Sequence, residues 1–115
     1  MAFSTTSLTR VGLALADPVR QGILITLLDG PQFPTQLVAL LGVSKSNLSN
    51  HLSCLRGCGL IVGKQIGRQI EYRLASPDLE HALRDLLRVE TTLECPEVHL
   101  PGTDSTIDPV YSLSV

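Results

Sequence analysis

Two cysteines stand four residues apart in the stretch HLSCLRGCG, residues 51–59. Side chains at this spacing on a helix have Cβ atoms about 5–6 Å apart, so the thiolates of Cys54 and Cys58 could share one metal ion. Thiolate ligands select soft ions. The C-terminal end of a helix disfavours a thiolate through the helix dipole, and a bound cation would reverse that penalty and hold both sulfurs deprotonated.

Two other interpretations of the cysteine pair stay open from the local sequence. Free cysteine is often a small buried hydrophobe, so Cys54 and Cys58 could be packing residues. They could also sense oxidants, although a redox enzyme typically places Cys-x-x-Cys at a helix N-terminus. The third cysteine, Cys95, lies far away in a polar segment. Three cysteines are too few for a secreted disulfide scaffold, which predicts free or metal-bound thiols and a cytoplasmic protein.

The pattern of apolar residues predicts the elements that position this pair. Helices are expected over residues 7–17, 18–29, 34–42, 45–59 and 77–93. Residues 60–75 change to an alternating pattern around Gly67 and Arg68, which predicts a β-hairpin. Two short helices joined by a tight turn are a helix-turn-helix signature. The order therefore predicts a mostly α winged helix-turn-helix with a small β-hairpin and an extra helix at each end.

The helix expected over residues 45–59 has two contrasting faces. At about 100° per residue, its buried edge is formed by Leu48, Leu52 and Leu55. The opposite face carries short, uncharged polar side chains, namely Ser46, Ser49, Asn50 and Ser53. Hydroxyl and amide groups suit base edges and phosphate oxygens, whereas an ordinary solvated helix would favour Glu and Lys. With Lys45 at the helix start and Arg68 at the hairpin tip, this face predicts recognition of double-stranded DNA.

The charge distribution supports a local phosphate-binding surface. The net charge is −2, which by itself argues weakly against nucleic acid. Residues 44–73 nevertheless carry five basic side chains against one acidic side chain, whereas residues 74–115 carry two against eight. A solvated surface could have the same composition, so the charge favours DNA binding only in combination with the helix-turn-helix.

The length of 115 residues fits one small domain and a tail. We expect a DNA-binding and dimerisation domain over residues 1–93 and a flexible C-terminal tail over residues 94–115, where Pro and acidic residues gather. Apolar residues of the last predicted helix step by three and four, at Leu79, Ala82, Leu86, Val89 and Leu93, and a second stripe follows at Leu83 and Leu87. This pattern predicts that one stripe faces its own domain and the other a partner subunit.

Three stretches of the chain resemble the ArsR/SmtB family of metal-responsive repressors. They are ALADPVRQGILITLLDG, SNLSNHLSCLRGCGLI and GRQIEYRLA, and the resemblance spans about residues 8–93. The two helix cysteines are similar to those of the cadmium- and lead-sensing CmtR branch. The resemblance implies a three-sulfur metal site at Cys54, Cys58 and, from the C-terminal region, Cys95. It also implies a homodimer through the first and last helices, whose apo form binds a palindromic operator and releases it when metal binds.

The effector implied by this resemblance is a cadmium or lead ion, with arsenite and zinc as alternatives. Three thiolates suit large soft ions, including trivalent arsenic, and His51 or a tail residue could add a fourth ligand for cadmium. Zinc needs about four ligands. A zinc site that the family places on its last helix is only half present here, at Asp78 and His81.

Other functions stay open at this stage. One is a thiol-oxidation or persulfide sensor of the same fold, and another is a metal-buffering protein with no DNA role. An enzyme is not expected, because we find no nucleophile–base pair, phosphate-binding Gly loop or paired carboxylates. A membrane partner is not expected either, because no apolar run approaches the roughly 20 residues of a membrane span.

Overall fold

The computed structural model describes residues 5–89 and contains five helices and one antiparallel hairpin in that range. The elements are α1 (Thr5–Leu15), α2 (Pro18–Leu27), α3 (Pro34–Leu41), α4 (Lys45–Gly57), β1 (Ile61–Ile66), β2 (Gln69–Leu74) and α5 (Pro77–Leu87). This order confirms the predicted winged helix-turn-helix. The predicted tail with Cys95, and residues 90–93 of the last predicted helix, lie outside the described residues.

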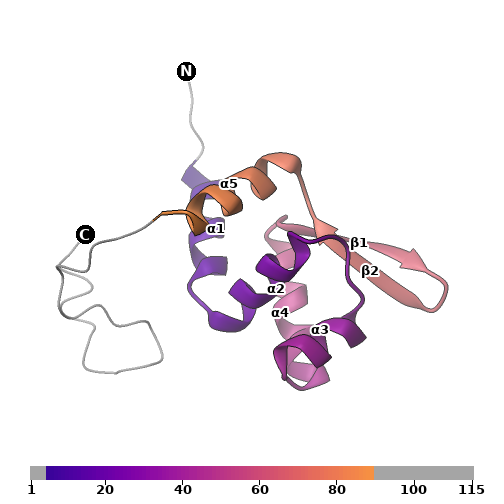
Figure 1. Cartoon of the computed structure of the whole chain (residues 1–115). Coiled ribbons are helices and arrows are strands. Elements are labelled where there is room, and N and C mark those ends of the chain that lie inside the picture. The colour runs from indigo at the N-terminus through magenta and orange to yellow at the C-terminus, as the bar shows by residue number, and fades with distance from the viewer. Residues whose placement is uncertain (1–4, 90–115) are drawn as a thin grey trace, which may run out of the picture.

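Helix α2 lies at the centre of the fold and contacts α1, α3, α4 and β2 (Figure 1). It begins after Asp17, whose carboxylate accepts a hydrogen bond from the N–H of Arg20 at 3.0 Å, and Pro18 occupies its first position. Both residue types suit a helix start. The core around α2 is built mainly from Leu and Ile and comprises Ala14, Ile23, Leu24, Leu27, Leu28, Leu37, Leu48, Leu52, Leu55, Leu60, Ile61, Tyr72 and Leu83. With this core, α2 can hold α4 and β2 in fixed positions.

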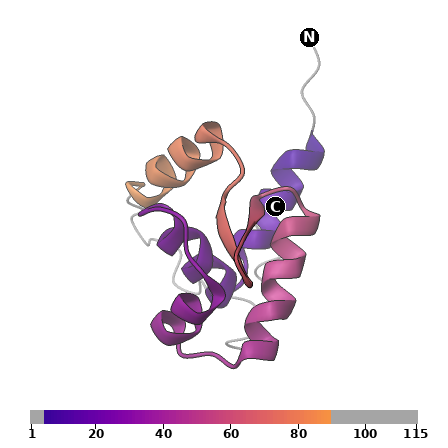
Figure 2. The same cartoon turned by 90° about the vertical axis from the view of Figure 1, so that its right-hand side faces the viewer.

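The helix-turn-helix consists of α3 and α4 and the short turn between them. Gly42 ends α3 in the left-handed region, at φ 66°, and its N–H donates to the carbonyl of Val38 at 2.9 Å. Ser44 then starts α4, because its hydroxyl accepts the N–H of Asn47 at 3.1 Å. Figure 2 shows α4 along one edge of the molecule, with α3 beside its N-terminal end. Helix α4 can therefore present a long face to a partner.

The hairpin is the wing, and it projects away from the helices (Figure 1). Its strands pair from Ile61 opposite Leu74 to Ile66 opposite Gln69, which confirms the predicted turn at Gly67 and Arg68. Gly67 has φ 62° and no residue other than Gly has positive φ in the described range, so the turn has the geometry of type II′. Two backbone hydrogen bonds, at 3.0 and 2.8 Å, also join Tyr72 of β2 to Gln32.

Helix α5 differs from its prediction in length and in the faces it buries. It ends at Leu87, and Arg88 caps it, so the predicted extension through residues 88–89 is wrong. The two predicted stripes do not separate as expected, because members of the same stripe differ in burial. Leu83 is 4% exposed whereas Leu87 is 57% exposed, and Leu79 packs against the core whereas Leu86 is 51% exposed. Arg84, in the last turn of α5, donates to the carbonyl of Leu28 at 2.8 Å, which connects this turn to the end of α2.

No helix within residues 5–89 is long and apolar enough to span a membrane.

Candidate functional site

Helix α4 carries the leucines that were predicted to be buried and most of the residues that were predicted to contact DNA. Leu48, Leu52 and Leu55 are buried in the core, as predicted. The predicted DNA-contacting residues of α4 are all exposed and comprise Lys45, Ser46, Ser49, Asn50 and Ser53. Because the leucines fix one edge of α4, the polar residues are held on its outer face. This arrangement suits a helix that enters the major groove.

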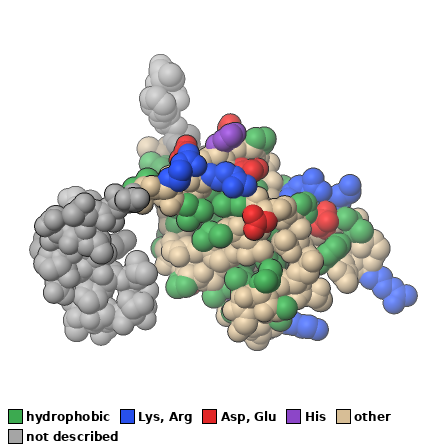
Figure 3. All heavy atoms as spheres, viewed as in Figure 1, with side chains coloured by type: hydrophobic (Ala, Val, Ile, Leu, Met, Phe, Trp, Pro, Cys, Tyr) green, Lys and Arg blue, Asp and Glu red, His purple; other side chains and the backbone are tan. Residues whose placement is uncertain are grey.

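Arg68 completes the predicted DNA-contacting set on the wing. It is exposed and occupies the second position of the hairpin turn, where a basic side chain can reach a phosphate. In Figure 3 the outer end of the hairpin carries basic side chains and no acidic ones. Within the described range, Lys45, Lys64 and Arg68 make no ion pair, whereas Arg73 pairs with Glu71 at 3.2 Å. The three cations are therefore available to an anionic partner.

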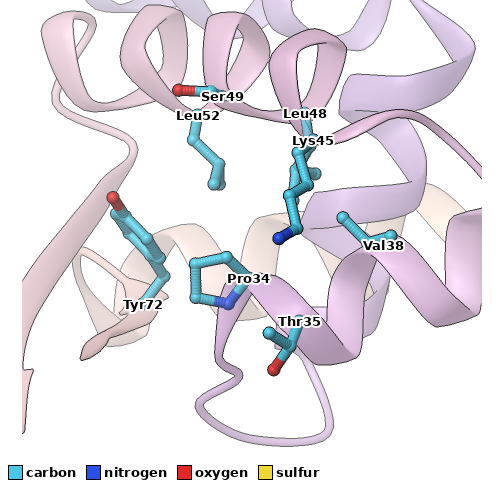
Figure 4. A pocket seen from close by; sticks show the side chains of 8 residues that line it. All are labelled: Pro34, Thr35, Val38, Lys45, Leu48, Ser49, Leu52 and Tyr72. Carbon is cyan, nitrogen blue, oxygen red and sulfur yellow. The ribbon is translucent and has the colours of Figure 1, made fainter. Parts of the chain in front are cut away.

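A pocket of about 300 Å³ lies between α3, α4 and β2, and it is lined by residues from both the polar face and the buried edge of α4. Its walls are mainly apolar, from Val38, Leu48, Leu52 and Tyr72 among others. Figure 4 shows the amino group of Lys45 over this hollow, between Pro34 and Val38. The Lys45 side chain therefore lies against the protein surface and would have to turn outward to reach a phosphate.

Cys58 has a fixed position at the end of α4. It is the C-cap residue, and the N–H of Leu60 donates to the carbonyl of Leu55 at 3.0 Å. The N–H of Gly59 donates to the carbonyl of Arg56 at 2.9 Å, and Gly59 has φ 78°. These two bonds and the left-handed glycine make a Schellman motif. Cys58 is half-buried and packs against the core.

Cys54 lies one helical turn before Cys58, whose N–H donates to the Cys54 carbonyl at 3.0 Å. Cys54 is exposed, and both thiols are free. An exposed Cys54 contributes little to packing, so the packing interpretation fits Cys58 better than Cys54. The described residues contain no cluster of three His, Cys, Asp or Glu side chains, and the predicted third ligand, Cys95, lies outside them.

His51 belongs to a polar cluster that also contains Arg20 and Asp17. Its Nδ1 is 3.4 Å from Nη1 of Arg20, and its Nε2 is 3.8 Å from Oδ2 of Asp17. A guanidinium only donates hydrogen bonds, so Nδ1 of His51 is the acceptor. Both ring nitrogens of His51 therefore face protein groups, which makes it a poor fourth ligand. No local sequence pattern indicates this cluster, because Arg20 and His51 are 31 residues apart.

The carboxyl of Asp17 has a perturbed pKa within this cluster. Partial burial raises its pKa, but the hydrogen bond from the Arg20 N–H and the attraction of His51 and of the Arg20 guanidinium outweigh that effect. The pKa of Asp17 is therefore lower than its usual value.

The half zinc site predicted on the last helix gains no further ligand. Asp78 and His81 are both exposed on α5, and no cluster of three ligands forms around them within residues 5–89. Asp78 lies in the first turn of α5, where an acidic side chain interacts favourably with the helix dipole.

Comparison with known proteins shows which family this chain resembles. A family described as bacterial regulatory protein, arsR family, matches residues 17–62. The HTH-type transcriptional regulator CmtR of Mycobacterium tuberculosis is 57% identical over 83 residues, which are 72% of this chain and 70% of that protein. The solved structure of the cadmium metal-sensor CmtR from the same organism matches with a TM-score of 0.62 and 52% identity, over 79% of this chain and 97% of that chain. A homodimeric winged helix-turn-helix DNA-binding domain from Mycobacterium bovis matches with a TM-score of 0.67 and 27% identity, over 70% of this chain and 75% of that chain.

Proposed function

Because this chain belongs to the arsR family of transcriptional regulators, we propose that it is a repressor that binds operator DNA as an apo homodimer and releases it when cadmium or lead binds. The proposed metal ligands are Cys54, Cys58 and Cys95. The observation that carries the proposal is the position of Cys54, an exposed thiol on the same helix that presents the DNA-contacting face. The relative CmtR is a transcriptional regulator, in agreement with the expectation that the chain is not an enzyme.

The proposed operator contacts come from α4 and the wing. Ser46, Ser49, Asn50 and Ser53 would contact base edges and the phosphates that flank them, and Lys45 and Arg68 would contact phosphates. Two features support this assignment: the polar face is held outward by the buried leucines, and the wing tip is basic. A repressor that works this way acts on DNA in the cytoplasm.

The proposed homodimer uses α1 and α5. Large apolar side chains on both helices are exposed, including Leu8 at 71% and Leu13 at 61% on α1, and Leu86 and Leu87 on α5. Leu86 and Leu87 line an apolar hollow of about 210 Å³ together with Leu15 of α1 and residues of α2. Apolar side chains clustered on two terminal helices favour a subunit interface. Two subunits related by a two-fold axis would present two α4 helices to successive half-sites of a palindrome.

The proposed metal response begins at the C-terminal end of α4. Cys54 and Cys58 are one turn apart, so their thiolates can bind one soft ion. A third thiolate from Cys95, in the same or the partner subunit, would connect this end of α4 to the C-terminal segment. Half-sites lie about 34 Å apart, so a shift or rotation of α4 lowers operator affinity. Three thiolates suit cadmium, lead or arsenite better than zinc.

An absorption titration tests the metal site. The reduced protein is titrated with cadmium, lead, arsenite and zinc, and thiolate-to-metal bands are recorded for wild type and for Cys54→Ser, Cys58→Ser and Cys95→Ser. A tight stoichiometric band that each substitution weakens supports the three-sulfur site. Ser53→Ala is the matched control, since Ser53 precedes Cys54 on α4 but belongs to the proposed DNA contacts. It should keep the metal band and lose operator affinity.

A thiol-oxidation sensor of the same fold is the second candidate, and the exposure of Cys54 is the observation that favours it. It predicts that peroxide releases operator DNA and that a reductant restores binding, with no effect of cadmium on the reduced protein. A metal-buffering protein would bind cadmium tightly and would select no duplex from a random-sequence library.

A further inference from the structure

Three residues connect α1, α2 and α4 through polar contacts, and we name Asp17, Arg20 and His51 together the interhelix clamp. Arg20, on α2, donates through Nη2 to the carbonyl of Leu13 on α1 at 2.8 Å. Its Nη1 lies 3.4 Å from Nδ1 of His51 on α4. Asp17, which caps α2, lies 3.8 Å from Nε2 of the same ring. One guanidinium therefore contacts both the first helix and the DNA-reading helix.

The contact with α1 is made to a carbonyl at the end of that helix. Leu13 lies in the last turn of α1, and among the described residues its carbonyl accepts only one other hydrogen bond, a long one of 3.3 Å from the N–H of Ala16. A positive charge at this end also interacts favourably with the helix dipole. Arg20 therefore holds the end of α1, and the position of α1 depends on where the guanidinium lies.

The contact with α4 is the weaker part of the clamp. The distances to His51 are long for hydrogen bonds, and Nε of Arg20 is buried without a hydrogen-bond partner among the described residues. A buried polar group that is only partly satisfied gains from rearranging its partners. A small displacement of α4 is therefore enough to change which groups Arg20 contacts.

We propose that the interhelix clamp transmits metal binding at Cys54 and Cys58 to the dimer helix α1, and so sets how strongly metal weakens DNA binding. This inference rests on the proposed function. His51 lies one turn before Cys54 on α4, so a metal ion that displaces the end of α4 also displaces the His51 ring. The Arg20 guanidinium then either moves with this ring or loses contact with it, and its hydrogen bond to the Leu13 carbonyl changes. Arg20 and His51 are thus positioning residues, and neither is a metal ligand or a DNA contact.

The test measures coupling separately from either binding event. Operator affinity is measured with and without one equivalent of cadmium per site for wild type, His51→Gln and Arg20→Lys, and the ratio of the two dissociation constants is the coupling factor. The operator is a duplex selected from a random-sequence library by the metal-free protein. Coupling factors of about 5–150 are typical of allosteric proteins. We expect both variants to lower the wild-type factor at least about fivefold, while metal-free operator affinity and cadmium affinity each change less than about threefold.

His81→Gln is the matched control, because His81 is exposed on α5 and lies outside the clamp. It should keep the wild-type coupling factor. Circular dichroism establishes whether each variant is folded. If His51→Gln does not fold, the conservative Arg20→Lys variant alone tests the clamp.

Three results would overturn the inference, and they differ from one another. Unchanged coupling in both clamp variants means that the clamp is only structural. A tenfold loss of cadmium affinity in His51→Gln makes His51 a metal ligand instead. A coupling factor of one in wild type refutes the proposed function itself and the clamp with it, and this result is visible before any variant is made.

Discussion

Gly59 fixes the end of the helix that carries both cysteines, so replacing it should have a defined cost. Its φ of 78° is in the left-handed region, where a Cβ costs about 1–2 kcal/mol. No atom lies within 4 Å of the site that a Cβ would occupy, so crowding adds nothing to this conformational cost. We therefore expect Gly59→Ala to lower the free energy of unfolding by about 1–2 kcal/mol, or the melting temperature by about 4–16 °C for a domain of this size.

Gly57, two residues before Gly59, provides a control in which the same substitution should change the free energy of unfolding in the opposite direction. It is the last residue of α4 and lacks positive φ, and a Cβ there would also meet no atom within 4 Å. Gly57→Ala should therefore stabilise the protein by about 0.5–1 kcal/mol. Thermal unfolding is followed by circular dichroism in metal-free reducing buffer, at one protein concentration because a dimer's stability depends on concentration.

The two variants also report on the metal site. Because Cys58 is the residue before Gly59, a disturbed Schellman motif should also weaken cadmium binding in Gly59→Ala, whereas Gly57→Ala should keep it. If the two variants have equal melting temperatures, the left-handed cap assigned to Gly59 is wrong, and so is the argument that it positions Cys58.

Three further predictions test the core, the charge cluster and the wing. Leu55 is 0% exposed, so Leu55→Ala should lower the free energy of unfolding, measured by urea denaturation, by about 2–5 kcal/mol. Leu40 is exposed, so Leu40→Ala should change this free energy by less than about 0.5 kcal/mol. The lowered pKa of Asp17 contributes stability above its unfolded value of about 3.9, and that stability is lost as pH falls through the folded value. Unfolding free energies measured from pH 7 to pH 3 should accordingly fall more steeply for wild type than for Asp17→Asn, and parallel curves would contradict the assignment. Arg68→Ala should weaken binding to all duplexes similarly and reduce the slope of log affinity against log salt by about one; an unchanged slope would remove Arg68 from the phosphate contacts.

Much of the fold follows from local patterns that the sequence displays. The spacing of Leu48, Leu52 and Leu55 predicts the buried edge of α4, and all three residues are buried. Gly67 and Arg68 predict the hairpin turn, since few residues other than Gly adopt positive φ. These predictions succeed because each depends on residues within one helix or one turn.

The features that escaped prediction depend on contacts between distant segments. The interhelix clamp joins residues 31 positions apart, and nothing in the local sequence around Arg20 or His51 marks them as partners. The pairing of Gln32 with Tyr72 is likewise a contact between a loop and a strand. In α5 the apolar pattern alone did not separate the residues that face the core from those left exposed, because both sets have helical spacing.

The candidate site is predictable in its residues but only partly in its geometry. Two glycines, Gly57 and Gly59, flank Cys58, and the local sequence alone does not say where α4 ends between them. The left-handed φ of Gly59 decides this and makes Cys58 the cap of α4 rather than a residue inside it. The exposure of Cys54 likewise had to come from the structure, and it is what favours a reactive or metal-binding thiol over a packing residue.

Operator binding by reduced wild type and Cys54→Ser, with and without cadmium, tests the central claim most directly. Fluorescence anisotropy of the library-selected duplex gives both dissociation constants at one fixed salt concentration. We expect cadmium to weaken wild-type binding at least about fivefold and to leave Cys54→Ser bound as tightly as the metal-free protein. Cadmium that leaves wild-type affinity unchanged, or that weakens both proteins equally, would contradict a metal-responsive repressor that acts through Cys54.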